Sequence, residues 1–119
     1  MTISKLPRPR EAVILRQVLD LLQARRVFAW RNQTGALRAG QDGKRYVHFG
    51  AVGSADVFAI LPPWSTHPGV FLAIETKRPG GKLTDAQARF LQNVQDQWGI
   101  AVVVEDVVVL DELLTDLGC

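Results

Sequence analysis

The sequence predicts an α/β fold in which helices flank a mixed central sheet. Three observations support this prediction. Residues 70–77 begin with an apolar run that is almost uninterrupted, which is typical of a strand buried on both faces. A helical pattern over 84–98 and a valine-rich strand over 100–104 follow it. A strand, a helix and a second strand in this order are typical of a parallel crossover.

The helix of this crossover carries its own start and stop signals. Thr84 and Gln87 form the pattern of a capping box, with Thr84 as the N-cap. Gly99 suits the C′ position just beyond the helix. The apolar stripe that would face the sheet consists of Ala86, Phe90, Val94 and Trp98.

The remaining elements follow from apolar spacing and from turn residues. Leu15, Val18 and Leu22 fall at helical spacing and predict a first helix from about residue 10 to 23. Residues 35–44 contain three glycines and are expected to form a loop or a flexible hairpin. Strands are expected at 27–30, 45–49 and 56–61, a short strand or helix lead-in at 107–110, and a terminal helix at 111–117.

Length and charge indicate one globular domain with a polarised charge. The chain has 119 residues, of which 47% are apolar, so we expect a single domain over 1–119, opened by a basic arm at 1–9. Residues 1–45 hold ten Lys or Arg against three Asp or Glu, whereas residues 46–119 hold four against nine. The basic half is typical either of a protein that binds a polyanion such as DNA or of a solvated basic surface.

The compartment is predicted from what the sequence lacks. Cys119 is the one cysteine and cannot form an internal disulfide, which suits a reducing cytosol. No apolar run is long enough to span a membrane, and no signal peptide opens the chain. We therefore expect a soluble, cytoplasmic protein without a membrane partner.

The central strand also carries charged side chains at its end. Glu75 and Lys77 are two residues apart and therefore share one face of the strand. Asp56 follows a glycine-bearing turn and opens another apolar strand. An Asp and a Glu-x-Lys on neighbouring strands can bind a divalent metal and cut a phosphodiester. Alternatively, Glu75 and Lys77 are a surface pair on an edge strand and Asp56 is a turn residue.

This pattern resembles the VRR-NUC family of the PD-(D/E)xK nuclease superfamily, over about residues 10–114. The resemblance rests on Glu11 early in the first helix, the Gly50–Asp56 turn, the Glu75-Thr76-Lys77-Arg78 segment, the Gly81–Gln87 segment and the Gly99–Val104 strand. Ala55 stands where many family members have proline. The resemblance implies a restriction-endonuclease-like core and a stand-alone, phage-type, metal-dependent DNA endonuclease involved in DNA repair. It also implies a bacterial or phage-infected cell as the setting.

The resemblance also implies roles for individual residues. Asp56 and Glu75, with the Thr76 carbonyl, would hold Mg²⁺ or Mn²⁺, which suits the preference of Mg²⁺ for oxygen ligands. Lys77 would hold the attacking hydroxide or stabilise the pentacovalent phosphate. Glu11 would bind a second metal or orient a water. Gln87 would contact Lys77 or the water, unless it serves only the capping box.

The expected partners are DNA and a second copy of the chain. Contacts to DNA would come from Arg31, Lys44, Arg45, Arg78 and Lys82, and would read its backbone rather than its bases. The resemblance implies a homodimer that acts on branched DNA such as a Holliday junction. Two alternatives are a non-catalytic nucleic-acid-binding module on the same fold and an interaction protein that dimerises through residues 28–30 and 100–110. The tryptophans are expected in core or dimer packing, and Trp64, in a proline-rich loop, is the candidate for an exposed one.

Overall fold

The computed structural model describes residues 10–33, 35–39, 41, 43–49 and 51–119, with the backbone alone in 35–39 and 45–49. The basic arm predicted at residues 1–9 and the side chain of Arg45 lie outside this description. Among the described residues, no helix has the length and the apolar character needed to cross a membrane.

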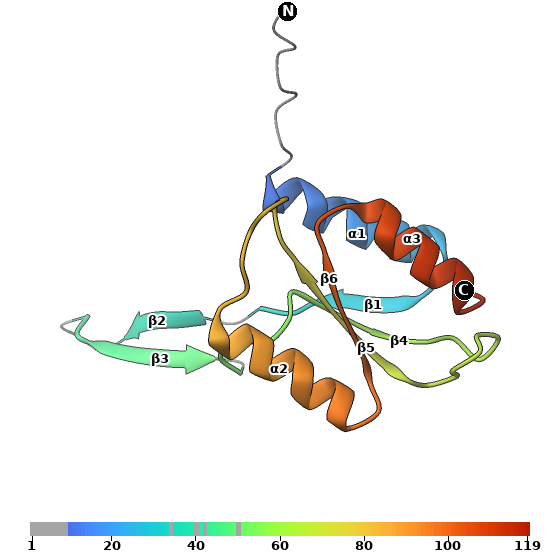
Figure 1. Ribbon diagram of the computed structural model, residues 1–119. Coiled ribbons are helices and arrows are strands. Elements are labelled where there is room, and N and C mark those ends of the chain that lie inside the picture. Colours follow the sequence, from blue (N-terminus) through green and yellow to red (C-terminus); the bar gives the residue numbers. More distant parts are fainter. Residues whose placement is uncertain (1–9, 34, 40, 42, 50) are drawn as a thin grey trace, which may run out of the picture.

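Four strands form a mixed sheet in the order β1-β4-β5-β6 (Figure 1). They are β1 (Phe28–Arg31), β4 (Val57–Ile60), β5 (Phe71–Thr76) and β6 (Ile100–Val104). β4 pairs antiparallel with β1 and with β5, whereas β5 and β6 are parallel. Helix α2 (Asp85–Asp96) connects the parallel pair, so the predicted crossover and the mixed sheet are both confirmed.

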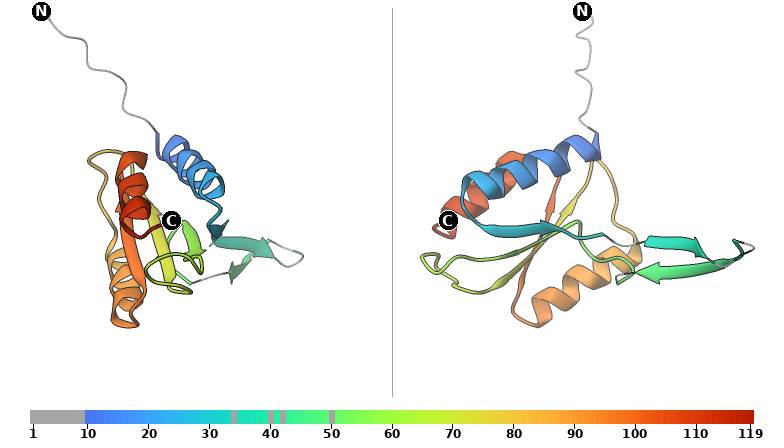
Figure 2. Two further views of the ribbon diagram at one scale, coloured as in Figure 1. Left: turned by 90° about the vertical axis from the view of Figure 1, so that its right-hand side faces the viewer. Right: turned by 180° about the vertical axis from the view of Figure 1, so that it is seen from behind.

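Helices cover both faces of this sheet (Figures 1 and 2). Helices α1 (Glu11–Ala24) and α3 (Val107–Asp116) lie side by side on one face, and α2 lies on the other. The larger core fills the space under α1 and α3, where Ile14, Val18, Leu72 and Ile74 are fully buried. A smaller core under α2 is built on Ala73 and Leu91. Residues 107–110 belong to α3, so of the two expectations for this segment the helix lead-in is correct.

A two-stranded hairpin projects from the body of the protein (Figures 1 and 2). Its strands are β2 (Gly35–Ala39) and β3 (Arg45–Phe49), which pair antiparallel with Gly35 opposite Phe49. The strand at 45–49 is confirmed. The sequence did not reveal β2 as a separate strand, because glycines at both of its ends favour a loop.

The predicted end of α2 is wrong at two residues. Trp98, at φ 66°, takes the left-handed position that Gly99 was expected to fill, and it is 89% exposed rather than part of the apolar stripe. The helix has already ended at Asp96, so Trp98 lies off its buried face. Gly99 is needed for space instead, because a Cβ there would lie 2.6 Å from Val94 Cγ1.

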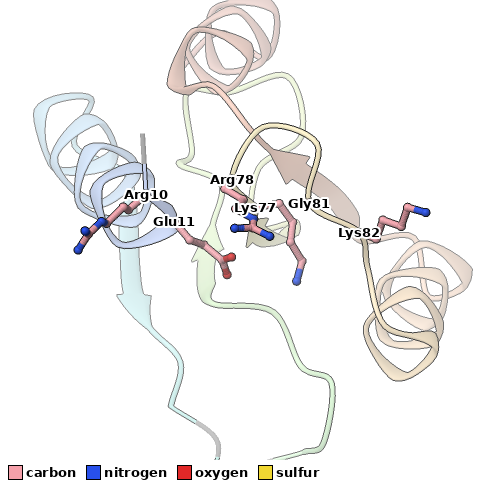
Figure 3. A pocket seen from close by; sticks show the side chains of 6 residues that line it. All are labelled: Arg10, Glu11, Lys77, Arg78, Gly81 and Lys82. Carbon is pink, nitrogen blue, oxygen red and sulfur yellow. The ribbon is translucent and has the colours of Figure 1, made fainter. Parts of the chain in front are cut away.

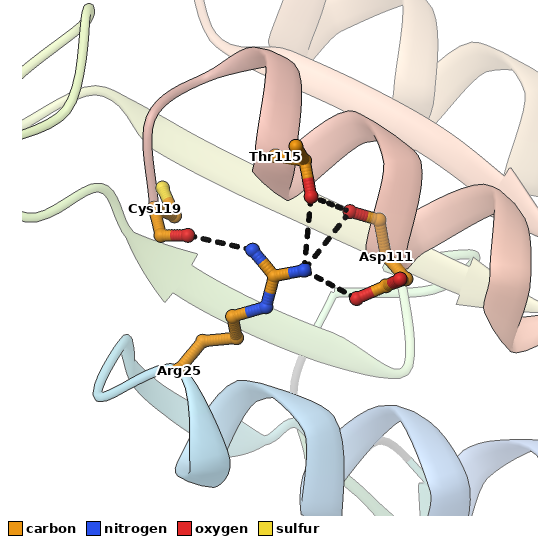
Figure 4. Close-up of polar contacts among 4 residues, drawn as sticks. All are labelled: Arg25, Asp111, Thr115 and Cys119. Carbon is orange, nitrogen blue, oxygen red and sulfur yellow. Dashed lines mark hydrogen bonds and ion pairs between the residues drawn. The ribbon is translucent and has the colours of Figure 1, made fainter.

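One arginine joins the first helix to the last. Arg25, at the C-terminal end of α1, donates from Nη1 to the Cys119 carbonyl at 2.7 Å and from Nη2 to Thr115 Oγ1 at 2.9 Å (Figure 4). The same guanidinium forms an ion pair with Asp111. Only a quarter of the Arg25 side chain is exposed, so water does not readily replace these partners.

We expect Arg25→Ala to lower the free energy of unfolding by about 1–3 kcal/mol, because it leaves several part-buried acceptors without a donor. Arg16→Ala is the control, since Arg16 is 81% exposed in an i,i+4 pair with Asp20; its cost is expected to stay below about 0.5 kcal/mol. Urea denaturation followed by circular dichroism measures both. Equal costs would contradict the role given to Arg25.

Candidate metal centre

Glu75 is a carboxylate inside the sheet. It occupies the next-to-last position of β5, pairs with Val103 of β6 and is 1% exposed. Gln87, one turn into α2, donates from Nε2 to Glu75 Oε1 at 3.1 Å. The second oxygen, Oε2, is buried and has no hydrogen-bond partner among the described residues.

The capping box of α2 is confirmed, and it fixes the orientation of the Gln87 amide. Thr84 Oγ1 accepts from the Gln87 backbone N–H at 3.1 Å, and Gln87 Oε1 accepts from the Thr84 backbone N–H at 2.9 Å. With its oxygen used in the cap, the amide presents its NH₂ group to Glu75. Gln87 therefore both completes the cap and donates to Glu75, a protein partner that the sequence analysis did not predict.

Asp56 reaches Glu75 from the turn before β4. Gly53, at φ 77°, allows this turn to lie against α2, where an added Cβ would be 2.5 Å from the Ala86 carbonyl carbon. Two donors from Thr76 meet one oxygen of Asp56: the backbone N–H and Oγ1 each lie 2.8 Å from Oδ2. The turn therefore holds Asp56 against the end of β5.

Glu11 completes a group of three carboxylates. It is the first residue of α1, where the helix dipole favours a negative charge, and it is exposed. One oxygen each from Glu11, Asp56 and Glu75 lies within 4.8 Å of the others. Three elements distant in sequence therefore place oxygen ligands around one point, which could hold a metal ion.

The electrostatics of Glu75 suit a cation. Burial, with the carboxylates of Asp56 and Glu11 close by, raises its pKa from 4.5 to about 8, although Lys77 opposes this shift. Without a cation, Glu75 therefore holds a proton at neutral pH. The unpartnered Oε2 and the all-oxygen set of ligands match the requirements of a hard divalent ion such as Mg²⁺.

A basic cleft opens beside the carboxylates. Its volume is about 570 Å³, and its lining residues are Arg10, Glu11, Lys77, Arg78, Gly81 and Lys82. Figure 3 shows Glu11, Lys77 and Arg78 together in the middle, with Arg10 and Lys82 on the two outer sides. Four of its six lining residues are basic, and Glu11 is the one acidic residue among them.

The structure thus brings Glu11, Asp56, Glu75 and Gln87 together and places Lys77 in the adjoining cleft. Arg78 and Lys82 line the cleft as well, whereas Arg31 lies in a separate groove between α1 and β1, and Lys44 lies next to β3 of the hairpin.

Sequence reasoning missed two polar residues near this site, and for Thr76 it named the backbone carbonyl but not the side chain. Arg10 lines the cleft, Asn32 bonds the turn that carries Asp56, and the Thr76 hydroxyl bonds Asp56 itself. Arg10 could have been found because it adjoins Glu11 in a basic segment. Asn32 had no such signal, since it is distant in sequence from Asp56.

Comparison with known proteins identifies one family. The model of the VRR-NUC domain matches residues 10–108, which include the three carboxylates, Lys77 and Gln87. No curated protein and no solved structure matches the chain.

The raised pKa of Glu75 predicts how stability depends on pH. The folded state binds this proton up to about pH 8, and the unfolded state releases it near pH 4.5, so the metal-free protein should lose stability as pH rises between these values. The loss attributable to Glu75 is on the order of 3–5 kcal/mol. Glu75→Gln should remove most of this dependence of the unfolding free energy on pH. The control Glu112→Gln, at an exposed position, should leave it unchanged. Parallel slopes for wild type and Glu75→Gln, from urea denaturation in EDTA, would contradict the prediction.

Gly53 and Gly43 form a matched pair of glycines. Both have a positive φ, but an added Cβ at Gly43 meets nothing within 4 Å. We expect Gly43→Ala to lower the free energy of unfolding by about 1 kcal/mol, because of backbone strain alone. Gly53→Ala should lower it by roughly 2 kcal/mol more, because the added Cβ also clashes with α2. Thermal unfolding of the two variants tests the difference, and equal losses would mean that the turn can move away from α2.

Proposed function

Because the chain belongs to the VRR-NUC domain family, a nuclease-type family, we propose that it is a metal-dependent endonuclease that hydrolyses DNA phosphodiester bonds. The observation that carries this proposal is the convergence of Glu11, Asp56 and Glu75 beside a basic cleft, with an oxygen of Glu75 buried and unpartnered. A buried carboxylate oxygen without a donor is uncommon in folded proteins, and a bound cation would satisfy it.

Asp56 and Glu75 would hold the ion, with the Thr76 carbonyl as a backbone ligand and Glu11 as a further carboxylate. The proposed ion is Mg²⁺ or Mn²⁺, since the available donors are oxygens. A divalent ion bound there would offset the negative charge of the phosphate and lower the pKa of a water molecule.

The chain's own groups orient the reactants. The Lys77 ammonium lies in the cleft, where it can hold a hydroxide by charge and stabilise the pentacovalent phosphate. Gln87 holds the carboxylate of Glu75 through Oε1, which leaves Oε2 available as a ligand. Glu11 lies on the opposite side of the cleft from Lys82 and can orient a water toward the phosphate.

The DNA would lie along the basic rim. Arg78 and Lys82 line the cleft and would contact phosphates next to the scissile bond, and Arg10 joins them. Arg31, Lys44 and Arg45 would contact DNA farther away, along β1 and the hairpin. Such contacts read shape and charge, which suits selectivity for branched DNA such as a Holliday junction. The expected setting is DNA repair or phage replication in the cytoplasm.

A homodimer is part of this proposal. Phe28, Trp30 and Ile60 are 68%, 39% and 37% exposed on neighbouring strands, with β1 at the edge of the sheet. Covering this apolar patch with a second copy would bring two cleavage sites to one branched substrate. Light scattering should give twice the chain mass, and Phe28→Asp should shift it toward that of one chain.

The test is the cleavage of a labelled four-way junction, a flap and a plain duplex in Mg²⁺, Mn²⁺ or EDTA. We expect metal-dependent cutting that favours the branched substrates. Asp56→Asn and Lys77→Met should each lower the rate at least about 100-fold, because the first removes a ligand charge and the second removes the cation facing the phosphate. Asp96→Asn, an exposed change at the far end of α2, is the control and should cut like wild type.

Unchanged cleavage by Lys77→Met would overturn the proposed role of the lysine. Tight, salt-sensitive DNA binding without cutting in either metal would favour the alternative of a non-catalytic nucleic-acid-binding module on the same fold.

A further inference from the structure

We propose that Thr76 and Asn32 are positioning residues that set the affinity of the metal centre by fixing Asp56. This inference rests on the proposed function, and it assigns roles to two side chains outside the carboxylate cluster.

The Thr76 side chain acts on Asp56 directly. As the middle residue of Glu75-Thr76-Lys77, it points to the opposite face of β5 from its two neighbours. Its Oγ1 nevertheless lies 2.8 Å from Asp56 Oδ2, the oxygen that also accepts from the Thr76 backbone N–H. Two donors from one residue therefore fix Oδ2, and Thr76 itself is 1% exposed, so water cannot substitute for the hydroxyl.

Asn32 acts on the turn that carries Asp56. Its side-chain Nδ2 donates to Ser54 Oγ at 2.7 Å and to the Ala55 carbonyl at 3.0 Å, and its backbone N–H donates to the Asp56 carbonyl at 2.8 Å. Asn32 follows β1 directly, so the edge strand and the Asp56 turn share this anchor. An aliphatic side chain at position 32 would leave the last residues before Asp56 without these donors.

The two anchors have a common consequence for a bound ion. A ligand whose second oxygen is held by donors loses less conformational freedom when it binds, so its partners affect metal affinity without touching the metal. With Oδ2 held by Thr76, Oδ1 would be the oxygen of Asp56 that remains available as a ligand. Gln87 gives Glu75 a parallel arrangement, with Oε1 held and Oε2 unpartnered.

The experiment measures Mn²⁺ binding by isothermal titration calorimetry on the full chain without DNA, next to thermal unfolding in EDTA. Thr76→Val keeps the shape of the side chain and the backbone N–H but removes the hydroxyl. We expect it to weaken Mn²⁺ binding about tenfold, and Thr76→Ser to restore the wild-type affinity. Asn32→Ala should weaken binding by a similar factor through the turn. Thr66→Val, in the exposed loop before β5, is the matched control and should leave the affinity unchanged.

A Thr76→Val protein that binds Mn²⁺ within twofold of wild type would overturn the role of the hydroxyl, even if DNA cleavage by the wild type is confirmed. The role of Thr76 and Asn32 would be merely structural if Mn²⁺ binding weakened in all variants in proportion to their loss of melting temperature and Thr76→Ser bound no better than Thr76→Val. If Thr76→Val fails to fold, Asn32→Ala still tests the anchoring of Asp56, and Mn²⁺ binding by Asn32→Ala within twofold of wild type would overturn it. Absence of Mn²⁺ binding in the wild type would overturn both the metal centre and this inference.

Discussion

The structure depends on one constraint, which is the burial of the Glu75 carboxylate within a central strand. A buried carboxylate must be protonated, paired or bound to a cation. Here the neighbouring carboxylates of Asp56 and Glu11 disfavour the ionised form of Glu75 further. Together with burial, they raise its pKa to about 8. Without a cation, Glu75 therefore keeps its carboxyl proton at neutral pH. The fold can therefore form without a cation at this cluster, and in the proposed function a divalent ion would displace that proton.

The same residues that build the fold also build the site. Gln87 closes the capping box of α2 and holds Glu75 with the remaining half of its amide. Gly53 lets the Asp56 turn approach the first turn of that helix. Helix α2 therefore cannot shift along the sheet without moving both carboxylates. A chain of 119 residues thus uses the same side chains to shape the fold and to hold the buried Glu75 carboxyl group.

Local sequence patterns predict most of the helices and strands and the main residues of the candidate site. Strand periodicity identified β5 and the shared face of Glu75 and Lys77, and the capping box located the start of α2. The prediction failed where geometry depends on distant partners. Asn32 acquires its role only when β1 is placed beside β4, so no spacing rule points to it. Trp98 fits the helical stripe by spacing, but α2 ends before reaching it. The homodimer and the branched substrate were expected from the family resemblance alone. The spacing of apolar residues within one helix or strand indicates neither property.

The placement of the tryptophans has a spectroscopic consequence. Trp30, Trp64 and Trp98 are 39%, 60% and 89% exposed, and the chain has no other tryptophan. Native emission will therefore already be that of largely solvated indoles, so intrinsic fluorescence is a poor reporter of unfolding for this protein. It is better suited to detecting association. Trp30 lies 5.4 Å from Phe28 and 6.1 Å from Phe58 in ring-centroid distance, and a molecule that covers this edge would shift its emission to shorter wavelength.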